Sequence, residues 1–413
     1  MVYDIAVIGG GAAGLTAAIC AAQKNRKLNI IVLESLSRVG KKLITTGNGR
    51  CNITNRNVSI TDYHGEELEA VNTVFGKYFL KETVDFFSKI GIEIIFEDDG
   101  RAYPYSYQAL SVVDALRFAC EEKEIEIKTD TKVSDFLFDN SVYSLFTENE
   151  KIMAKSIIVA TGLFSGGNSV GSDGSFYNLL KKKGFKTVKT TPSIVQLKTD
   201  NAVTKQLKGI KLEAFATLSN GGEAVRTEKG EVLFTDYGLS GPPILQLSRE
   251  VSRKNGAFTV LLDLMYDFTE KQLTDLLYRR RENLKQRNAE NFLTGLLNKR
   301  VGQTVVKLCG INLSSEISSI TDNEIIKIAK KIKNFDFSVV GTTGFNNSQV
   351  TAGGIALCEF DKNTLQSKRY KGMFAAGEIL DVDGDCGGYN LQWAWSSGML
   401  AADSAVKYIG GNL

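Results

Sequence analysis

The stretch Tyr3-Asp-Ile-Ala-Val-Ile-Gly-Gly-Gly-Ala-Ala-Gly-Leu15 decides the fold of this chain. Residues 3–8 form a short apolar run rich in β-branched side chains, which predicts a buried parallel strand. The run turns at once into Gly9-x-Gly11-x-x-Gly14, and the alanine-rich segment that follows predicts a helix through about Lys24. In such a motif Gly9 allows a tight turn, Gly11 lets a pyrophosphate approach the backbone, and Gly14 lets the helix pack closely on the strand.

The next segment carries the acidic residue that this motif requires. Residues 29–33 predict a second strand, which ends in Glu34, 20 residues after Gly14. The helix between the strands offers free N–H groups and partial positive charge to phosphates, and a carboxylate in this place accepts hydrogen bonds from an adenosine ribose. Because strand, glycines, helix, strand and acid occur together, the sequence predicts a dinucleotide site rather than a plain βαβ turn.

Composition is that of an ordinary globular protein and argues against several functions. The 413 residues are too many for one small core, so two or three domains are expected. Charged residues make up 23% and hydrophobic residues 43%, and the net charge of +3 favours neither nucleic acid nor an anionic membrane as a partner. Residues 1–15 lack the pattern of a signal peptide, and no apolar run reaches the ~18–20 residues that span a bilayer. We therefore expect a cytoplasmic protein.

Metal-binding and nucleophilic residue types are sparse. Six cysteines are scattered along the chain without a CxxC pair, so neither zinc nor a dithiol redox centre is indicated. His64 is the one histidine, which argues against a Ser-His-Asp triad or a multi-histidine metal site, and no metal is expected. It lies in a polar stretch and is expected to be solvated.

Several segments before residue 192 are expected to lie along the same ligand. The polar, glycine-rich residues 40–55 predict an ordered binding loop directly after the acid-bearing strand. Helices are predicted at 78–89 and 109–123, and short β-like runs at 125–129, 131–138, 142–147 and 155–160. These runs predict a small antiparallel meander that returns to a buried strand. That strand ends in Thr161-Gly162, and open α/β sheets bind ligands at such carboxyl ends.

The middle of the chain changes its pattern near residue 268. Residues 194–266 alternate as β-strands do, with turns predicted at Asn220-Gly221-Gly222 and Lys229-Gly230. The pattern then becomes helical, with capping boxes at Thr269/Gln272 and Thr321/Glu324, and residues 335–341 predict a returning strand. The basic run at 279–287 is interpreted as a solvated helix face rather than a nucleic-acid patch.

The end of the chain supplies a second glycine-loop-to-helix unit. Residues 372–382 predict a buried strand with Gly377-Glu378, and a glycine-rich loop leads into a helix over about 391–408. The positive end of this helix, near Asn390, suits an electron-rich part of a ligand. Together with the 40–55 loop and Thr161-Gly162, this unit indicates a ligand as long as FAD, whose reduced flavin carries negative charge that a helix N-terminus stabilises.

Both ends of the chain are then expected in one FAD domain, with about 193–345 as an insertion. The sequence holds no second GxGxxG motif, so a separate nicotinamide domain is not expected. If NAD(P)H is used, it docks transiently over the flavin, and the sequence does not choose between NADH and NADPH.

Several stretches spread over nearly the whole chain form a distinctive combination. They are Gly9–Gly14, Gly47-Asn-Gly-Arg-Cys-Asn-Ile-Thr-Asn55, Leu233-Phe-Thr-Asp-Tyr-Gly-Leu-Ser-Gly-Pro242, Thr351-Ala-Gly-Gly354, Ala375-Ala-Gly-Glu378 and Gly387-Gly-Tyr-Asn-Leu-Gln-Trp-Ala-Trp-Ser-Ser397. The combination resembles the HI0933-like family of three-domain bacterial flavoproteins, which includes aminoacetone oxidase and a 3-dehydro-bile-acid Δ4,6-reductase.

The resemblance implies an α/β fold with a glutathione-reductase-like Rossmann FAD domain, an inserted β domain and a small helical domain. The expected boundaries are 1–192 and 346–413 for the FAD domain, 193–267 and 334–345 for the β domain, and 268–333 for the helical part. The resemblance also implies FAD contacts at Gly14, Glu34, Leu43, Gly49, Val133, Glu378, Asn390 and Leu391. Val133 has no chemical signature and would contribute backbone atoms to the adenine.

The full set of expected cofactor-binding residues combines these contacts with the motifs around them. It comprises Gly9, Gly11, Ala13, Gly14, Glu34, Ser35, Lys42, Leu43, Gly49, Arg50, Cys51, Asn52, Val133, Thr161, Gly162, Gly377, Glu378, Asn390 and Leu391. Within the set, Arg50 pairs with a phosphate or substrate carboxylate or else fixes its loop, and Cys51 is a packed thiol or a redox group.

Three aromatic residues near Asn390 are candidates for the wall of the flavin site, namely Tyr389, Trp393 and Trp395. For the two tryptophans, packing in the core is the alternative. Flavin N5 carries a hydride itself, so no catalytic residue is assigned. If a C=C bond is reduced, a proton donor is needed, and Tyr389 is one candidate.

The sequence therefore predicts an FAD-dependent oxidoreductase that acts on a small organic molecule. It is either a reductase supplied by NAD(P)H or an amine or aminoketone oxidase that passes electrons to O2. The alternative is a flavoprotein that binds RNA or a protein partner through its insertion, which only the basic run at 279–287 supports. Substrate identity and oligomeric state do not follow from the sequence.

Overall fold

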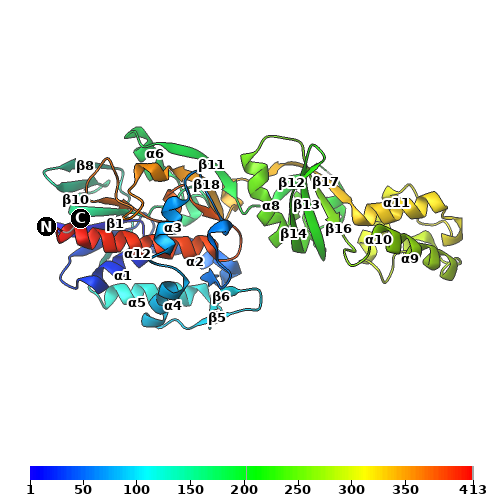
Figure 1. Cartoon of the computed structure of the whole chain (residues 1–413), viewed down its shortest axis with the longest axis horizontal. Coiled ribbons are helices and arrows are strands. Elements are labelled where there is room, and N and C mark those ends of the chain that lie inside the picture. Colours follow the sequence, from blue (N-terminus) through cyan, green and yellow to red (C-terminus); the bar gives the residue numbers. More distant parts are fainter. Residues whose placement is uncertain (201, 412–413) are drawn as a thin grey trace. The chain divides into compact units, whose positions relative to one another are not determined.

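The computed structural model describes residues 1–200 and 202–411. The chain forms two compact units (Figure 1). The first combines Met1–Ser193 with Phe345–Leu413, and the second is Ile194–Gly344. The two ends of the chain thus build one unit, and the second is inserted between them.

The first unit begins with the strand, helix and strand that the glycine motif predicts. These are β1 (Val2–Ile8), α1 (Ala12–Lys24) and β2 (Ile30–Leu33). A Cβ atom at Gly14 would lie 1.9 Å from the carbonyl oxygen of Gly9, so only glycine lets the helix follow the turn this closely. The predicted local structure is confirmed.

A parallel sheet carries both ends of the chain. Its parallel strands run in the order β7-β2-β1-β10-β19, where β7 is Glu126–Lys128, β10 is Lys151–Val159 and β19 is Met373–Ala375. The antiparallel strands β8 (Asp135–Asp139) and β9 (Val142–Phe146) extend from the first half of β10. The prediction that residues 125–129 belong to the meander was wrong, because β7 pairs in parallel with β2 instead.

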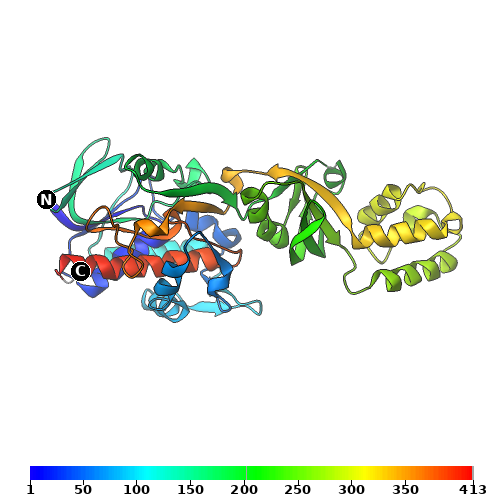
Figure 2. The ribbon, with the colours of Figure 1, turned by 45° about the horizontal axis from the view of Figure 1, so that its top comes forward.

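Side chains of β1 alternate between two apolar clusters, one on each face of the sheet. Ile5 and Val7 pack with α1 and with α5 (Ala109–Glu121), whereas Ala6 and Ile8 pack with residues of β10 and α6 (Ser175–Lys182). The C-terminal helix α12 (Tyr389–Ile409) lies against α1, where a Cβ at Gly398 would come within 2.6 Å of the oxygen of Ala13. Figures 1 and 2 show α12 ending near the start of β1.

Shorter elements complete the first unit. They are α2 (Lys41–Thr45), β3 (Thr54–Asn55), β4 (Tyr63–His64), α3 (Glu69–Phe75), α4 (Leu80–Lys89), β5 (Ile94–Phe96), β6 (Arg101–Pro104), β11 (Thr187–Ser193), β18 (Val350–Ile355) and β20 (Asp383–Gly384). Among them β11 pairs antiparallel with β18, and β4 with β20. The structure thus places helices in the predicted ranges 78–89 and 109–123, and adds α3.

The second unit contains a closed barrel in the order β12-β15-β14-β13-β16-β17. Its elements are β12 (Leu197–Thr199), α7 (Ala202–Gln206), β13 (Lys211–Asn220), β14 (Glu223–Phe234), β15 (Gly238–Ser240), α8 (Pro242–Arg253), β16 (Phe258–Asp263) and β17 (Phe335–Thr342). The turn predicted at Gly221-Gly222 joins β13 to β14. The turn predicted at Lys229-Gly230 was wrong: Gly230 lies inside β14, where a Cβ would come within 3.3 Å of Pro243 in α8.

Helices lie between β16 and β17. They are α9 (Glu270–Asn283), α10 (Lys299–Leu308) and α11 (Asp322–Lys333). Both predicted capping boxes form, because Thr269 accepts from the backbone N–H of Gln272 and Thr321 from that of Glu324. Barrel and helices share one apolar cluster, which holds this segment together.

Candidate active site

The carboxyl ends of neighbouring parallel strands meet at one edge of the first unit. Backbone hydrogen bonds continue the sheet there from Gly9 N to Leu33 O (2.8 Å), from Ala160 N to Ile8 O (2.8 Å) and from Ala376 N to Val159 O (2.9 Å). The residues that follow are Glu34, Thr161 and Gly377. The edge therefore brings together segments that the sequence predicted separately.

The turn from β1 into α1 forms a cradle with space for an anion. A Cβ at Gly9 would meet the oxygen of Ala160 at 2.5 Å, whereas a Cβ at Gly11 would meet nothing within 4 Å. Gly11 is also the N-cap of α1, and it makes no side-chain cap hydrogen bond. The helix N-terminus therefore presents N–H groups and positive potential to open space, which fits a pyrophosphate.

Glu34 lies beside this cradle at the end of β2. Its Oε2 accepts from the N–H of Gly10 at 2.9 Å, and its Oε1 accepts from the N–H of Leu36 at 2.8 Å and from the hydroxyl of Ser35 at 3.1 Å. These bonds fix the carboxylate next to the glycine turn. A carboxylate retains further lone pairs, which suits it to the hydroxyls of a ribose.

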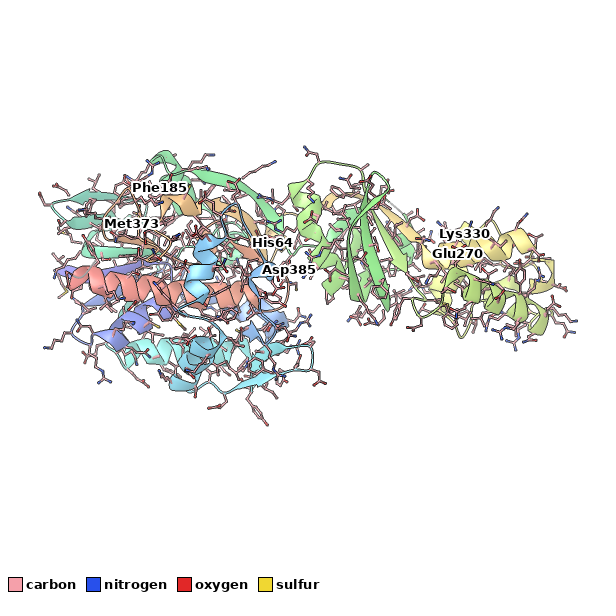
Figure 3. The ribbon with its side chains drawn as sticks, viewed as in Figure 1. His64, Phe185, Glu270, Lys330, Met373 and Asp385 are labelled. Carbon is pink, nitrogen blue, oxygen red and sulfur yellow. The ribbon has the colours of Figure 1, made fainter. Side chains whose placement is uncertain are left out.

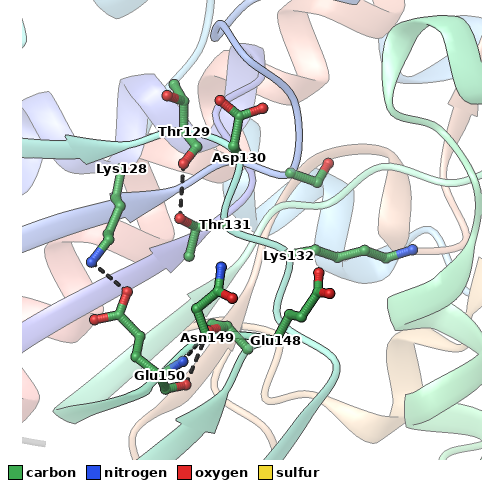
Figure 4. A pocket seen from close by; sticks show the side chains of 10 residues that line it. Lys128, Thr129, Asp130, Thr131, Lys132, Glu148, Asn149 and Glu150 are labelled. Atoms are coloured by element: carbon green, nitrogen blue, oxygen red, sulfur yellow. Dashed lines mark hydrogen bonds and ion pairs between the residues drawn. The ribbon is translucent and has the colours of Figure 1, made fainter.

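A polar pocket of about 430 Å³ has Ser35, the neighbour of Glu34 in the sequence, in its wall. Figure 4 shows the side chains that line it. Its walls are Ser35, residues 128–132 and the turn 147–150. The N–H of Thr131 donates to the oxygen of Glu34 at 2.8 Å, so the loop before Val133 runs directly beside the acid. Val133 is buried and belongs to the apolar cluster on one face of the sheet.

The loop at 40–55 is ordered, with α2 followed by a 3₁₀ turn at Thr46–Gly49. Leu43 is buried, and Gly49 has a φ of +82° with open space where a side chain would be. Cys51 is fully buried, and burial raises its pKa to about 12, which favours the packed thiol over a redox group. Asn52 accepts from the N–H of Ala102 at 3.3 Å.

Arg50 is engaged within its own loop region. Its guanidinium lies 4.4 Å from the centre of the Tyr103 ring, and its Nη1 is 3.7 Å from a carboxylate oxygen of Glu97. These contacts match the loop-fixing interpretation. The position of the Arg50 side chain therefore does not support a role in phosphate binding.

An ion pair links the loop after β2 to the C-terminal segment. Lys42 Nζ is 2.5 Å from Oε2 of Glu378, whose Oε1 accepts from the N–H of Thr351 at 2.9 Å. Gly377, the neighbour of Glu378, donates from its N–H to the hydroxyl of Ser397 at 2.9 Å. Residues that are far apart in the sequence are thereby held in one half-buried arrangement.

The start of α12 is fixed by its own side chains. Asn390 accepts from the N–H of Gly384 at 2.8 Å and donates to the oxygens of Gly384 (2.7 Å) and Asp385 (3.3 Å). Trp393 and Trp395 are buried and donate to backbone oxygens of Gly377 and Ile53. The tryptophans are therefore core residues, not exposed walls of a site.

His64 differs from the expectation of a solvated residue. Its Nε2 lies 2.8 Å from Oδ1 of Asp385, and both side chains are largely covered (Figure 3). Pairing of β4 with β20 brings them together, with His64 opposite Asp383. No local pattern in the sequence indicates this pair, because the partners are 321 residues apart.

A phosphate cradle at the carboxyl edge of a parallel sheet, an acid beside it and a second helix start nearby define a Rossmann-type dinucleotide-binding enzyme. Residues 3–404 match the model of the HI0933-like protein Rossmann domain, so the chain belongs to the HI0933-like family. The predicted family membership is confirmed.

Comparisons with individual proteins find similar enzymes along nearly the whole chain. It is 31% identical over 406 residues to a 3-dehydro-bile acid delta(4,6)-reductase of Clostridium scindens, covering 98% of this chain and 99% of the relative. It is 25% identical over 408 residues to the ribosomal RNA dihydrouridine synthase of Escherichia coli, covering 98% of each. A 3-ketosteroid-delta4-(5alpha)-dehydrogenase of Rhodococcus jostii RHA1 shares the fold, with a TM-score of 0.50 at 14% identity over 98% of this chain and 97% of the other.

The chain is an FAD-dependent oxidoreductase, as the sequence predicted. The open cradle at Gly11 and the helix N-terminus above it fit the pyrophosphate of FAD. Within residues 1–200 and 202–411, no helix has the length and apolar character needed to cross a membrane.

Proposed function

We propose that this enzyme is a reductase that saturates a C=C bond conjugated to a carbonyl group in a small organic molecule. The observation that carries the proposal is the end-to-end match to a relative named as a delta(4,6)-reductase of 3-dehydro-bile acids. The second relative is named for making dihydrouridine, in which a C=C bond conjugated to a carbonyl is also saturated. Both names therefore describe the same class of reaction, in which a C=C bond conjugated to a carbonyl group is saturated.

We propose the following placement of FAD along the strand edge. The pyrophosphate lies over Gly11, Ala13 and Gly14, the ribose on Glu34, and the adenine in the pocket beside Ser35 and Val133. The remaining members of the expected set would contact the ribityl chain and the ring system. They are Gly9, Lys42, Leu43, Gly49, Arg50, Cys51, Asn52, Thr161, Gly162, Gly377, Glu378, Asn390 and Leu391. Bound flavin supplies hydride transfer at N5, and the chain's own groups bind, orient and exclude water.

For the insertion we propose the division already expected from the sequence. Residues 193–267 and 334–345 would form a β domain, and 268–333 a helical domain. The barrel and the helices α9–α11 support this division.

A small molecule is favoured over RNA because two arginines of the basic run, Arg280 and Arg281, are engaged within the protein. Arg280 donates to the oxygens of Phe292 and Thr294, and Arg281 donates to the oxygen of Ile320. Arginines used in this way are poor phosphate contacts, since RNA binding requires guanidinium groups that remain available.

Anaerobic half-reactions test the proposal. The purified enzyme is mixed with NADH or NADPH, and bleaching of the flavin band is recorded. The reduced enzyme is then mixed separately with 2-cyclohexen-1-one, a 3-oxo-Δ4,6 bile acid, a uridine-rich RNA and O2. We expect bleaching by a nicotinamide and rapid reoxidation by an enone. Reoxidation by O2 alone would indicate an oxidase, and reoxidation by the RNA alone would contradict the small-molecule substrate.

A further inference from the structure

The His64–Asp385 pair is a titratable cluster to which FAD binding gives no task. The imidazole Nε2 and the Asp385 Oδ1 are 2.8 Å apart. The exposed fraction of the side chain is 24% for His64 and 15% for Asp385. They are thus shielded but still accessible to a small molecule. Neither the sequence motifs nor the family resemblance assigns a role to His64 or Asp385.

The bonding leaves one ring nitrogen available for chemistry. Nε2 faces the carboxylate, and among the described residues Nδ1 has no hydrogen-bond partner. A carboxylate at one nitrogen fixes the ring orientation, so that a protonated ring can release its proton from the other nitrogen in a defined direction. This is the arrangement of an oriented general acid.

The pair is attached to the same structure that is proposed to hold the flavin ring. Asp385 is bound through its backbone oxygen by Asn390 at 3.3 Å, at the start of α12. Tyr63, next to His64 on β4, donates from its hydroxyl to the oxygen of Tyr389 at 2.8 Å. Both partners are therefore anchored to the N-terminal turn of α12 from two sides, which limits their movement relative to a bound ring (Figure 3).

We propose that His64, positioned by Asp385, is the proton donor of the reduction; the proposal rests on the enone reductase function above. Bound reduced flavin would supply a hydride to the β carbon of the double bond, and Nδ1 of His64 donates a proton to the α carbon, so that the C=C π bond is replaced by two C–H bonds. A nicotinamide donor would restore the two electrons that the flavin gives up. The neutral imidazole regains its proton from water, so the cycle balances.

Tyr389 is the competing donor at this place. Burial raises its pKa to about 12, which makes it a weaker acid than an ordinary tyrosine. Tyr389→Phe therefore serves as the matched variant for His64→Gln, since each removes one proton donor and keeps the size of the side chain.

The experiment compares both half-reactions in holoenzyme with unchanged flavin spectrum and unchanged melting temperature. We expect His64→Gln to reduce flavin with the nicotinamide at the wild-type rate. Its reoxidation by the enone that works for wild type should be slower by about 10²-fold or more, the usual contribution of a general acid. Asp385→Asn should be slower by about tenfold or more, because the ring loses its orientation. Wild-type reoxidation in His64→Gln with a large loss in Tyr389→Phe would overturn the proposal.

A readout independent of turnover uses the one histidine of the chain. Labelling with 15N-histidine gives one pair of ring nitrogen signals. We expect the neutral form to carry its proton on Nε2 in wild type, and Asp385→Asn to lose this preference. Adding the saturated ketone product to oxidised enzyme should shift the Nδ1 signal. An unchanged Nδ1 signal with a bound product would contradict contact between His64 and the substrate.

The two proposals fail in different ways. If no enone reoxidises the wild-type enzyme, the reductase function is wrong, whatever the variants do. If an enone reoxidises wild type and His64→Gln equally fast, the function stands and the proton donor is another group.

Discussion

Gly11→Ala is expected to separate binding of the cofactor from stability of the fold. Gly11 has φ −87° and ψ −167°, a conformation that alanine adopts without strain, and its Cβ would meet no protein atom within 4 Å. The apoprotein should therefore unfold at nearly the wild-type temperature, because the ~0.4–1 kcal/mol gained by replacing glycine at a compatible site is offset by a similar cost of alanine at the N-cap of α1.

The added methyl group instead occupies the space that the pyrophosphate would use. Overpacking by one methyl costs ~1–3 kcal/mol, which corresponds to a rise of about 5- to 150-fold in the Kd for FAD. The Kd is measured by titrating apoprotein with FAD and following the quenching of flavin fluorescence. Thermal unfolding of the same apoprotein gives the stability.

Gly14→Ala is the matched control. There the Cβ would lie 1.9 Å from the oxygen of Gly9, and both groups belong to the backbone, so neither can move aside easily. This variant should lower the melting temperature of the apoprotein itself. The reasoning is refuted if Gly11→Ala binds FAD as tightly as wild type, or if it destabilises the apoprotein as Gly14→Ala does.

Three further changes test other parts of the structure. Thr321→Ala should lower the free energy of unfolding by about 1 kcal/mol in chemical denaturation, because α11 loses its N-cap. The Arg369 guanidinium holds the pKa of Glu359 below its ordinary value, so this group stabilises the fold above that value and the stability is lost as the pH falls through the lowered pKa. Glu359→Gln should therefore flatten the acid limb of the melting temperature against pH; an unchanged limb would contradict the pair's role. Cys51, with its pKa raised to about 12, should resist alkylation in the native protein, as peptide mass spectrometry can check.

Local sequence signals predicted the parts of the fold that short-range geometry controls. The spacing of Gly9, Gly11 and Gly14 predicts one strand, turn and helix, and the close contact of Gly14 with the oxygen of Gly9 spans only five residues. The capping boxes at Thr269 and Thr321 are likewise complete within four residues. Such features need no knowledge of the remaining chain.

Local sequence signals could not predict the pairings between segments that are distant in the sequence. The run at 125–129 has the same composition whether it joins β2 or a meander, and only the tertiary fold selects the parallel partner. Lys42 and Glu378 are 336 residues apart in the sequence, so a local pattern around either residue does not indicate the ion pair. The ligand contact proposed for Val133 would use its backbone alone, which carries no residue-specific signal.

The pairing of β11 with β18 bears on how this protein was assembled. The chain leaves the first unit at Ser193 and is back in it by Val350, and these two residues face each other across an antiparallel ladder. Opposed positions of this kind are ~4.5–5.5 Å apart, a span that a two-residue hairpin closes. A shortened gene in which such a hairpin replaces the intervening segment would thus keep every strand of the nucleotide fold.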